Sequence, residues 1–142
     1  MPYLAGTVLA LMVSGLATLT GLDRDRAFYP TVLVVIASYY VLFAVMGGSG
    51  HALVVETLVM TGFLLAAVIG FKRSLWLVVA ALAAHGVFDV FHGRVVANPG
   101  VPAWWPAFCL TYDITAAAFL AWLLRRSHPR INAHTTLTEG PH

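Results

Sequence analysis

The chain has 142 residues, of which 60% are hydrophobic and only 10% charged, and its formal net charge is +2. Soluble globular domains are about 45–50% apolar and about 25% charged, so this composition excludes that class, a disordered chain and a nucleic-acid-binding protein. The single cysteine, Cys109, also excludes an internal disulfide framework and a zinc site made only of cysteines. We therefore expect a small integral membrane protein.

Five apolar runs follow one another along the chain, separated by short polar or glycine-rich joints and one longer joint. Roughly 20 apolar residues in an α-helix cross a hydrocarbon core about 30 Å thick. The predicted spans are 3–21, 28–47, 51–71, 74–92 and 104–124. They predict an all-α integral membrane protein, with one five-helix transmembrane domain over 1–126. The polar residues 127–142 predict a flexible cytoplasmic tail.

The positions of lysine and arginine predict how the bundle is oriented. All eight of these residues lie outside the predicted spans. Seven of them follow the first, third and fifth spans, whereas only Arg94 lies in a joint on the opposite side. Because positive charge collects on the cytoplasmic side, we expect the N-terminus outside and the C-terminus in the cytoplasm. The expected location is a plasma membrane, and the Ala-, Val- and Arg-rich composition favours a bacterial inner membrane.

Apart from His51, in the cap region of the third span, five acidic or histidine side chains lie within the predicted spans, where they are costly. They are Glu56 in the third span, His85, Asp89 and His92 in the fourth, and Asp113 in the fifth. A charged side chain at the bilayer centre costs at least about 2.5–3.5 kcal/mol, so such residues normally pair inside the bundle and mark function. With a helical rise of about 1.5 Å per residue, all five fall in the outer half of the membrane at overlapping levels.

The fourth span repeats its polar residues at helical spacing. His85, Asp89 and His92 follow an i, i+4, i+7 pattern and share one face. Imidazole and carboxylate together suit zinc, iron or manganese. The i, i+3 pair of Asp89 and His92 resembles the Glu-x-x-His pair of di-iron carboxylate bundles, where other helices supply further carboxylates. We predict these three residues as metal ligands, with Glu56 and Asp113 as catalytic acid–base groups.

Aromatic and basic residues near the outer joint form a predicted substrate-binding group, which comprises Arg94, Trp104, Trp105, Tyr112 and Tyr39. The neighbouring Tyr40 lies at a comparable depth and is a second hydrogen-bond donor. An aromatic belt at the membrane interface is the simpler explanation for the two tryptophans. Cys109, one turn from Asp113, fits a soft ligand, a redox thiol or inert packing.

The predicted function is that of a metal-dependent membrane enzyme, with zinc as the first choice of metal and iron or copper as the second. Hydrolysis of a lipid or another amphiphile is favoured over its oxidation. Three alternatives remain open: an ion or proton transporter or relay, a small subunit of a larger membrane complex, and a purely structural hydrogen-bond network. In the structural alternative, His85 is a core histidine that bonds to Asp113 or Glu56 and joins the helices, and Asp89 forms an outer-surface salt bridge with Arg94 or His92. The expected partners are a membrane lipid or amphiphile, and either a second copy of the chain or another membrane protein.

Overall fold

The computed structural model describes residues 1–127, and within this range every regular element is helical. The elements are α1 (Pro2–Thr20), the short 3-10 helix η1 (Leu22–Arg24), α2 (Phe28–Met46), α3 (Gly50–Lys72), α4 (Leu75–Val95) and α5 (Trp105–Ser127). The five α-helices are long and apolar enough to cross a membrane, which indicates a multi-pass membrane protein. The predicted five-helix, all-α fold is therefore confirmed. Apart from Ser127, the predicted tail lies outside the described residues.

Local sequence signals explain where these helices begin and end. The Ser49 hydroxyl accepts a hydrogen bond from the Ala52 amide at the start of α3, and Ser74 does the same for Trp76 at the start of α4. Gly21 ends α1 in the left-handed region, with φ 79°, a conformation that suits glycine. Both α4 and α5 continue about one turn beyond the predicted ends of their spans.

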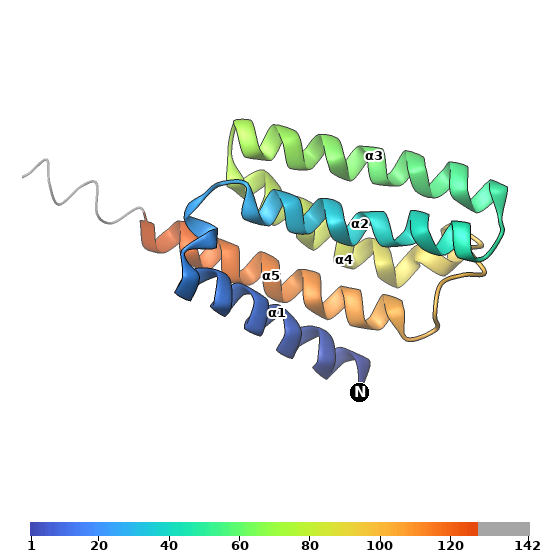
Figure 1. The fold of residues 1–142 in the computed structure, drawn as a ribbon, viewed down its shortest axis with the longest axis horizontal. Helices are drawn as coiled ribbons and strands as arrows, with labels where there is room; N and C mark the ends of the chain where they lie inside the picture. The colour runs from blue at the N-terminus through green and yellow to red at the C-terminus, as the bar shows by residue number, and fades with distance from the viewer. Residues whose placement is uncertain (128–142) are drawn as a thin grey trace, which may run out of the picture.

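The helices lie side by side along one common direction, as Figure 1 shows. Helix α4 packs against both α3 and α5, α2 packs against α3, and α1 packs against α5. A Cβ added at Gly6 would collide with the Phe108 carbonyl oxygen and the Thr111 hydroxyl, so the missing side chain lets α1 approach α5 closely. The Thr111 hydroxyl also donates to the Tyr3 carbonyl oxygen across this contact, at 2.9 Å.

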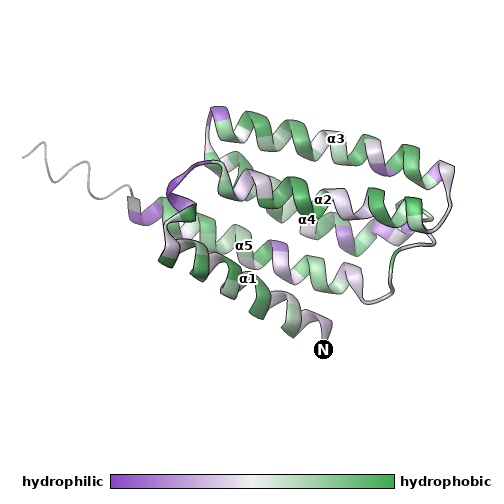
Figure 2. Cartoon of the chain, in the orientation of Figure 1, coloured by the Kyte–Doolittle hydropathy of each residue, from purple (hydrophilic) through white to green (hydrophobic). Residues whose placement is uncertain are grey.

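Apolar side chains cover much of the outer surface of the bundle. Figure 2 shows hydrophobic colouring along most of the helices and hydrophilic colouring at the joint that contains η1. Only 17% of the most apolar window of α3 is buried within the protein, and Leu58 is 68% exposed. An exposed apolar surface of this extent is typical of a protein covered by lipid.

The larger apolar core cluster and the buried ionisable residues lie toward opposite ends of the bundle, and a small apolar cluster of Ala44, Ala52 and Val96 lies at the same end as the ionisable residues. The apolar core contains Leu33 of α2, Val78 and Leu82 at the start of α4, and Leu120 near the end of α5. The buried ionisable residues lie toward the other end, in the first half of α3 and α5 and the second half of α4. The half of the bundle near the long α4–α5 joint therefore holds the candidate site.

Candidate functional site

The five acidic and histidine residues that the sequence places inside the spans, beyond the cap-region residue His51, are all buried. They are Glu56, His85, Asp89, His92 and Asp113, and none of them is more than 2% exposed. Burial of a charged group is unfavourable unless that group is paired and hydrogen-bonded. The seven lysines and arginines of the described residues are all exposed, so the five buried groups depend on one another.

His85 of α4 is in contact with two carboxylates. Its Nδ1 atom lies 2.7 Å from Asp113 Oδ2 on α5 and 3.5 Å from Asp89 Oδ2 one turn along α4. Gly86 allows the two helices to approach, because a Cβ there would lie 3.1 Å from the Leu110 carbonyl oxygen. A small residue at this helix crossing thus allows Asp113 to contact the polar stripe of α4, the face that carries His85, Asp89 and His92.

Tyr40 of α2 contacts both Asp89 and His92 on α4. Its hydroxyl donates to Asp89 Oδ1 at 2.6 Å. Its ring stacks on the ring of His92, with the centroids 4.0 Å apart and the planes inclined by 25°. The sequence predicts Tyr40 only as a second hydrogen-bond donor beside Tyr39, whereas the structure shows that Tyr40 is a buried part of the cluster.

His92 forms a second pair, with Glu56 of α3. The distance from His92 Nε2 to Glu56 Oε1 is 2.7 Å. The side-chain amide of Asn98, in the α4–α5 joint, donates to the same carboxylate oxygen at 2.9 Å and to the Tyr40 carbonyl oxygen at 3.0 Å. No feature of the sequence pattern pointed to Asn98, because a single asparagine in a loop of glycine and proline is common.

His85, Asp89 and Asp113 have the arrangement of a potential metal site. One ligand atom from each residue lies within 4.8 Å of the other two. Asp89 Oδ2 and Asp113 Oδ1 have no hydrogen-bond partner among residues 1–127, and neither does Glu56 Oε2. Three buried carboxylates beside two imidazoles and no buried lysine or arginine require added positive charge, either as protons or as a cation.

The predicted ligands and acid–base groups are therefore grouped differently from the sequence-based expectation. His85 and Asp89 lie together as predicted, but the structure places Asp113 beside them in place of His92. His92 instead pairs with Glu56. Arg94 is exposed and forms no ion pair with Asp89 within the described part of the chain. The two carboxylate–imidazole pairs, His85 with Asp113 and His92 with Glu56, are contacts between helices of the kind that the structural alternative predicts.

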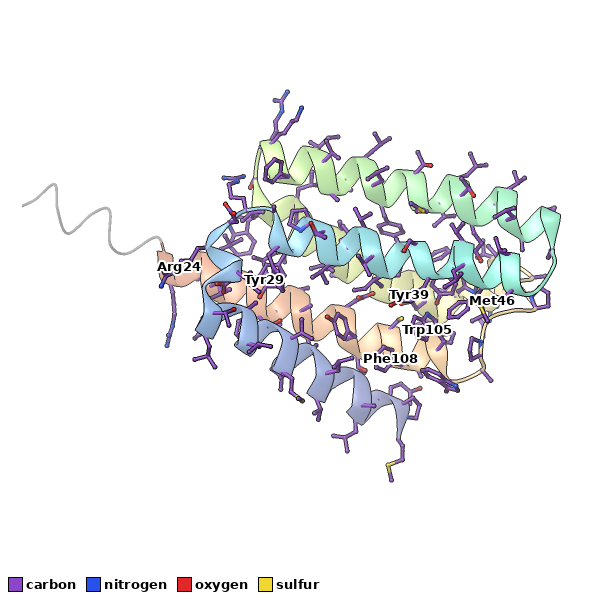
Figure 3. The ribbon with its side chains drawn as sticks, in the orientation of Figure 1. Arg24, Tyr29, Tyr39, Met46, Trp105 and Phe108 are labelled. Carbon is purple, nitrogen blue, oxygen red and sulfur yellow. The ribbon has the colours of Figure 1, made fainter. Side chains whose placement is uncertain are left out.

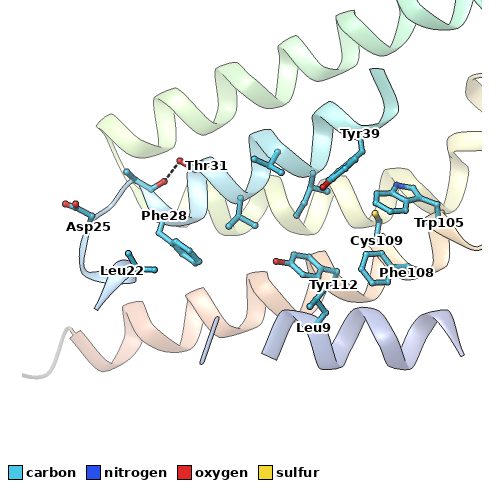
Figure 4. Close-up of a pocket in the computed structure, with 14 residues that line it drawn as sticks. Leu9, Leu22, Asp25, Phe28, Thr31, Tyr39, Trp105, Phe108, Cys109 and Tyr112 are labelled. Atoms are coloured by element: carbon cyan, nitrogen blue, oxygen red, sulfur yellow. Dashed lines mark hydrogen bonds between the residues drawn. The ribbon is translucent and has the colours of Figure 1, made fainter. Parts of the chain in front are cut away.

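Three of the five predicted substrate-binding residues line one groove. Tyr39, Trp105 and Tyr112 lie along a groove of about 640 Å³ bordered by α1, α2 and α5, which Figure 4 shows in close-up. Figure 3 places Tyr39, Trp105 and Phe108 together, far from Arg24 and Tyr29 at the opposite end. Trp104 and Arg94 do not line this groove, and Trp104 is 53% exposed.

Cys109 lies where the groove and the buried cluster come close together. It lines the groove, it is itself buried, and it lies one helical turn before Asp113 on α5. No family model, curated protein or solved structure matches this chain. A function must therefore be inferred from the chemistry of the cluster and the groove.

Proposed function

We propose that this chain is a multi-pass membrane enzyme that binds a transition metal at His85, Asp89 and Asp113. The observation that carries the proposal is this fully buried imidazole with two carboxylates, in which one ligand atom of each residue lies within 4.8 Å of the other two. Asp89 and Asp113 each also keep one carboxylate oxygen without a hydrogen-bond partner among residues 1–127. The positive-inside pattern supports placing the site in the outer half of a plasma membrane, with the N-terminus outside.

The donor atoms fit zinc best. A catalytic zinc ion takes three protein ligands of the imidazole and carboxylate type and keeps a further position for water or substrate. Two carboxylates neutralise a divalent cation, which removes much of the penalty of burying charge. Iron or copper is the second choice for the same donor set.

The surrounding residues support hydrolysis. A bound metal would supply a Lewis acid and an activated water near neutral pH. Tyr40 holds one oxygen of Asp89, which leaves the other oxygen directed toward His85. Glu56 keeps one free oxygen and contacts His92, so this pair is the proposed acid–base group that accepts a proton and passes it on.

The groove supports a lipid or another amphiphile as the substrate. Its walls are largely apolar, and Tyr39, Tyr112 and Trp105 add hydrogen-bond donors. A polar group bound at the end of the groove that these three residues line would lie near Cys109, one helical turn from Asp113. The proposed substrate therefore enters sideways from the membrane.

A proton relay is the second candidate, because two acid–imidazole pairs, Glu56 with His92 and Asp113 with His85, lie on either side of the Tyr40–Asp89 hydrogen bond. The other half of the bundle weakens this candidate, since apolar residues such as Leu33, Val78 and Leu82 fill it. An interface with a second copy or a larger complex would be needed to complete such a path.

Elemental analysis of the purified protein tests the proposal. The wild-type chain should contain close to one transition metal per chain, and the His85→Ala, Asp89→Ala double variant should contain none. His51→Gln is the matched control, because His51 is an exposed histidine at the start of α3. If the wild type contains no metal even after supplementation, the proposal is wrong, and proton flux in liposomes then tests the relay.

A further inference from the structure

A second cavity lies beneath the α4–α5 joint, separate from the groove. It has a volume of about 650 Å³ and is lined by Ser49 before α3, by residues of the joint from Val96 to Ala103, and by His92 and Pro106. None of these residues lines the groove between α1 and α2. The groove and this cavity are therefore separate. The groove lies along the side of the bundle, and the cavity lies at the end where α2 is joined to α3 and α4 is joined to α5.

His92 forms the boundary between this cavity and the buried cluster. It lines the cavity, it is itself 2% exposed, and its Nε2 contacts Glu56. Glu56 Oε2 has no partner among residues 1–127, and Glu56 is 1% exposed. The His92 imidazole and the Glu56 carboxylate therefore lie between the cavity and Asp89. Tyr40 links them to Asp89, because its ring stacks on His92 and its hydroxyl donates to Asp89.

The joint is held tightly over these residues. Asn98 donates to Glu56 and to the Tyr40 carbonyl oxygen, and its own side-chain oxygen accepts from the Gly100 amide at 3.2 Å. Gly100 lies directly against the end of α2, where an added Cβ would be 2.8 Å from the Phe43 carbonyl carbon. The cavity is consequently a fixed feature of the fold, and Asn98 orients the Glu56 carboxylate toward His92.

We propose that this cavity is the port through which a divalent cation enters, and that His92 and Glu56 form its first binding station. This inference rests on the proposed function, since it supplies the metal for the site at His85, Asp89 and Asp113. Borderline cations such as zinc favour imidazole with carboxylate. Removal of a partner in a metal site typically changes metal affinity by about 10–100-fold.

Zinc uptake by the purified full-length protein tests the port directly. The metal-free protein is mixed with zinc, and both the uptake rate and the final stoichiometry are recorded with a competing fluorescent chelator. His92→Gln and Glu56→Gln should slow uptake by about tenfold or more and leave the final stoichiometry at the wild-type value. His51→Gln should load at the wild-type rate, because His51 does not line the cavity.

A chemical block avoids the question of whether a variant folds. Ala97 is exposed and lines the cavity, so an Ala97→Cys protein can be folded first and then labelled with a bulky thiol reagent. Labelling should slow zinc uptake relative to the same unlabelled protein, whereas labelled His51→Cys should load normally. The buried Cys109 should remain unlabelled.

The outcomes separate the two proposals. If the wild-type protein takes up zinc but labelled Ala97→Cys and His92→Gln load as fast as the wild type, the port is wrong and the metal site stands. If the wild-type protein takes up no zinc, iron or copper, both proposals are overturned.

Discussion

The hydrogen bond between Tyr40 and Asp89 provides the sharpest test of the buried cluster. Both residues are at least 98% buried, and the 2.6 Å distance falls in the range of about 2.5–2.7 Å for a hydroxyl that donates to a carboxylate. Tyr40→Phe removes the donor with little change in shape. Because Asp89 Oδ2 already lacks a partner, the variant leaves both oxygens of this carboxylate without a hydrogen bond.

Two general magnitudes bracket the expected effect. Hydrogen bonds to charged groups contribute about 1.5–3 kcal/mol to stability. Bonds between membrane helices average about 0.6 kcal/mol and reach about 1.7 kcal/mol. A short bond to a buried carboxylate belongs at the upper end of the membrane range, so we expect a coupling free energy of about 1.5 kcal/mol between Tyr40 and Asp89.

The assay is a double-mutant cycle on reversible unfolding by dodecyl sulfate in mixed micelles. It uses Tyr40→Phe, Asp89→Ala and the combined variant, with a chelator present so that bound ions do not contribute. Tyr39→Phe is the matched control, because the Tyr39 hydroxyl has no hydrogen bond within the described residues, and its effect should stay within about 0.5 kcal/mol. A coupling free energy below about 0.5 kcal/mol would refute the bond as a stabilising contact.

Three further predictions follow from close contacts and from ligand chemistry. Gly100→Ala should lower the free energy of unfolding by about 1–3 kcal/mol, because its Cβ would overlap the Phe43 carbonyl group. Gly93→Ala is the control, because no atom lies near its Cβ. Equal melting temperatures for the Gly100→Ala variant and the wild type would contradict the contact. Gly6→Ala should destabilise the α1–α5 contact by a similar amount in thermal unfolding, whereas Gly15→Ala, with open space at its Cβ, should not. Zinc affinity should fall as the pH is lowered from about 8 to about 5.5, because protons compete with zinc for the ligand atoms. An affinity that does not change with pH in titration calorimetry would exclude ligation by His85.

The sequence was sufficient to predict the five helices and the buried acidic and histidine residues of the cluster, but not Asn98 or the position of Tyr40. Length and apolar composition specify a membrane helix with little ambiguity, so the five helices matched the prediction to within a few residues. The cost of buried charge identified Glu56, Asp89 and Asp113 as residues that need partners. The i, i+4 spacing also placed Asp89 next to His85 correctly, because that contact lies within one helix.

The pairing between helices could not be read from the sequence. Whether Asp113 meets His85 or His92 depends on the rotation and height of α5 against α4, which the contact at Gly86 determines. Tyr39 and Tyr40 are neighbours, but consecutive residues differ by about 100° around a helix, so one faces the groove and the other the cluster. Only the folded structure shows that Tyr40 is the buried residue of the two.

The order of the helices along the chain has a consequence for biosynthesis. Helices α3 and α4 precede α5 in the chain, so the segments that carry Glu56, His85, Asp89 and His92 leave the ribosome before Asp113 does. An aspartate near a helix centre opposes insertion by about 2.5–3.5 kcal/mol. Apolar neighbours in α4 and the Tyr40 hydroxyl of α2 are present to offset this before α5 arrives. The nascent protein therefore passes through a stage in which His85 lacks its Asp113 partner, and the fifth helix completes the pairing last.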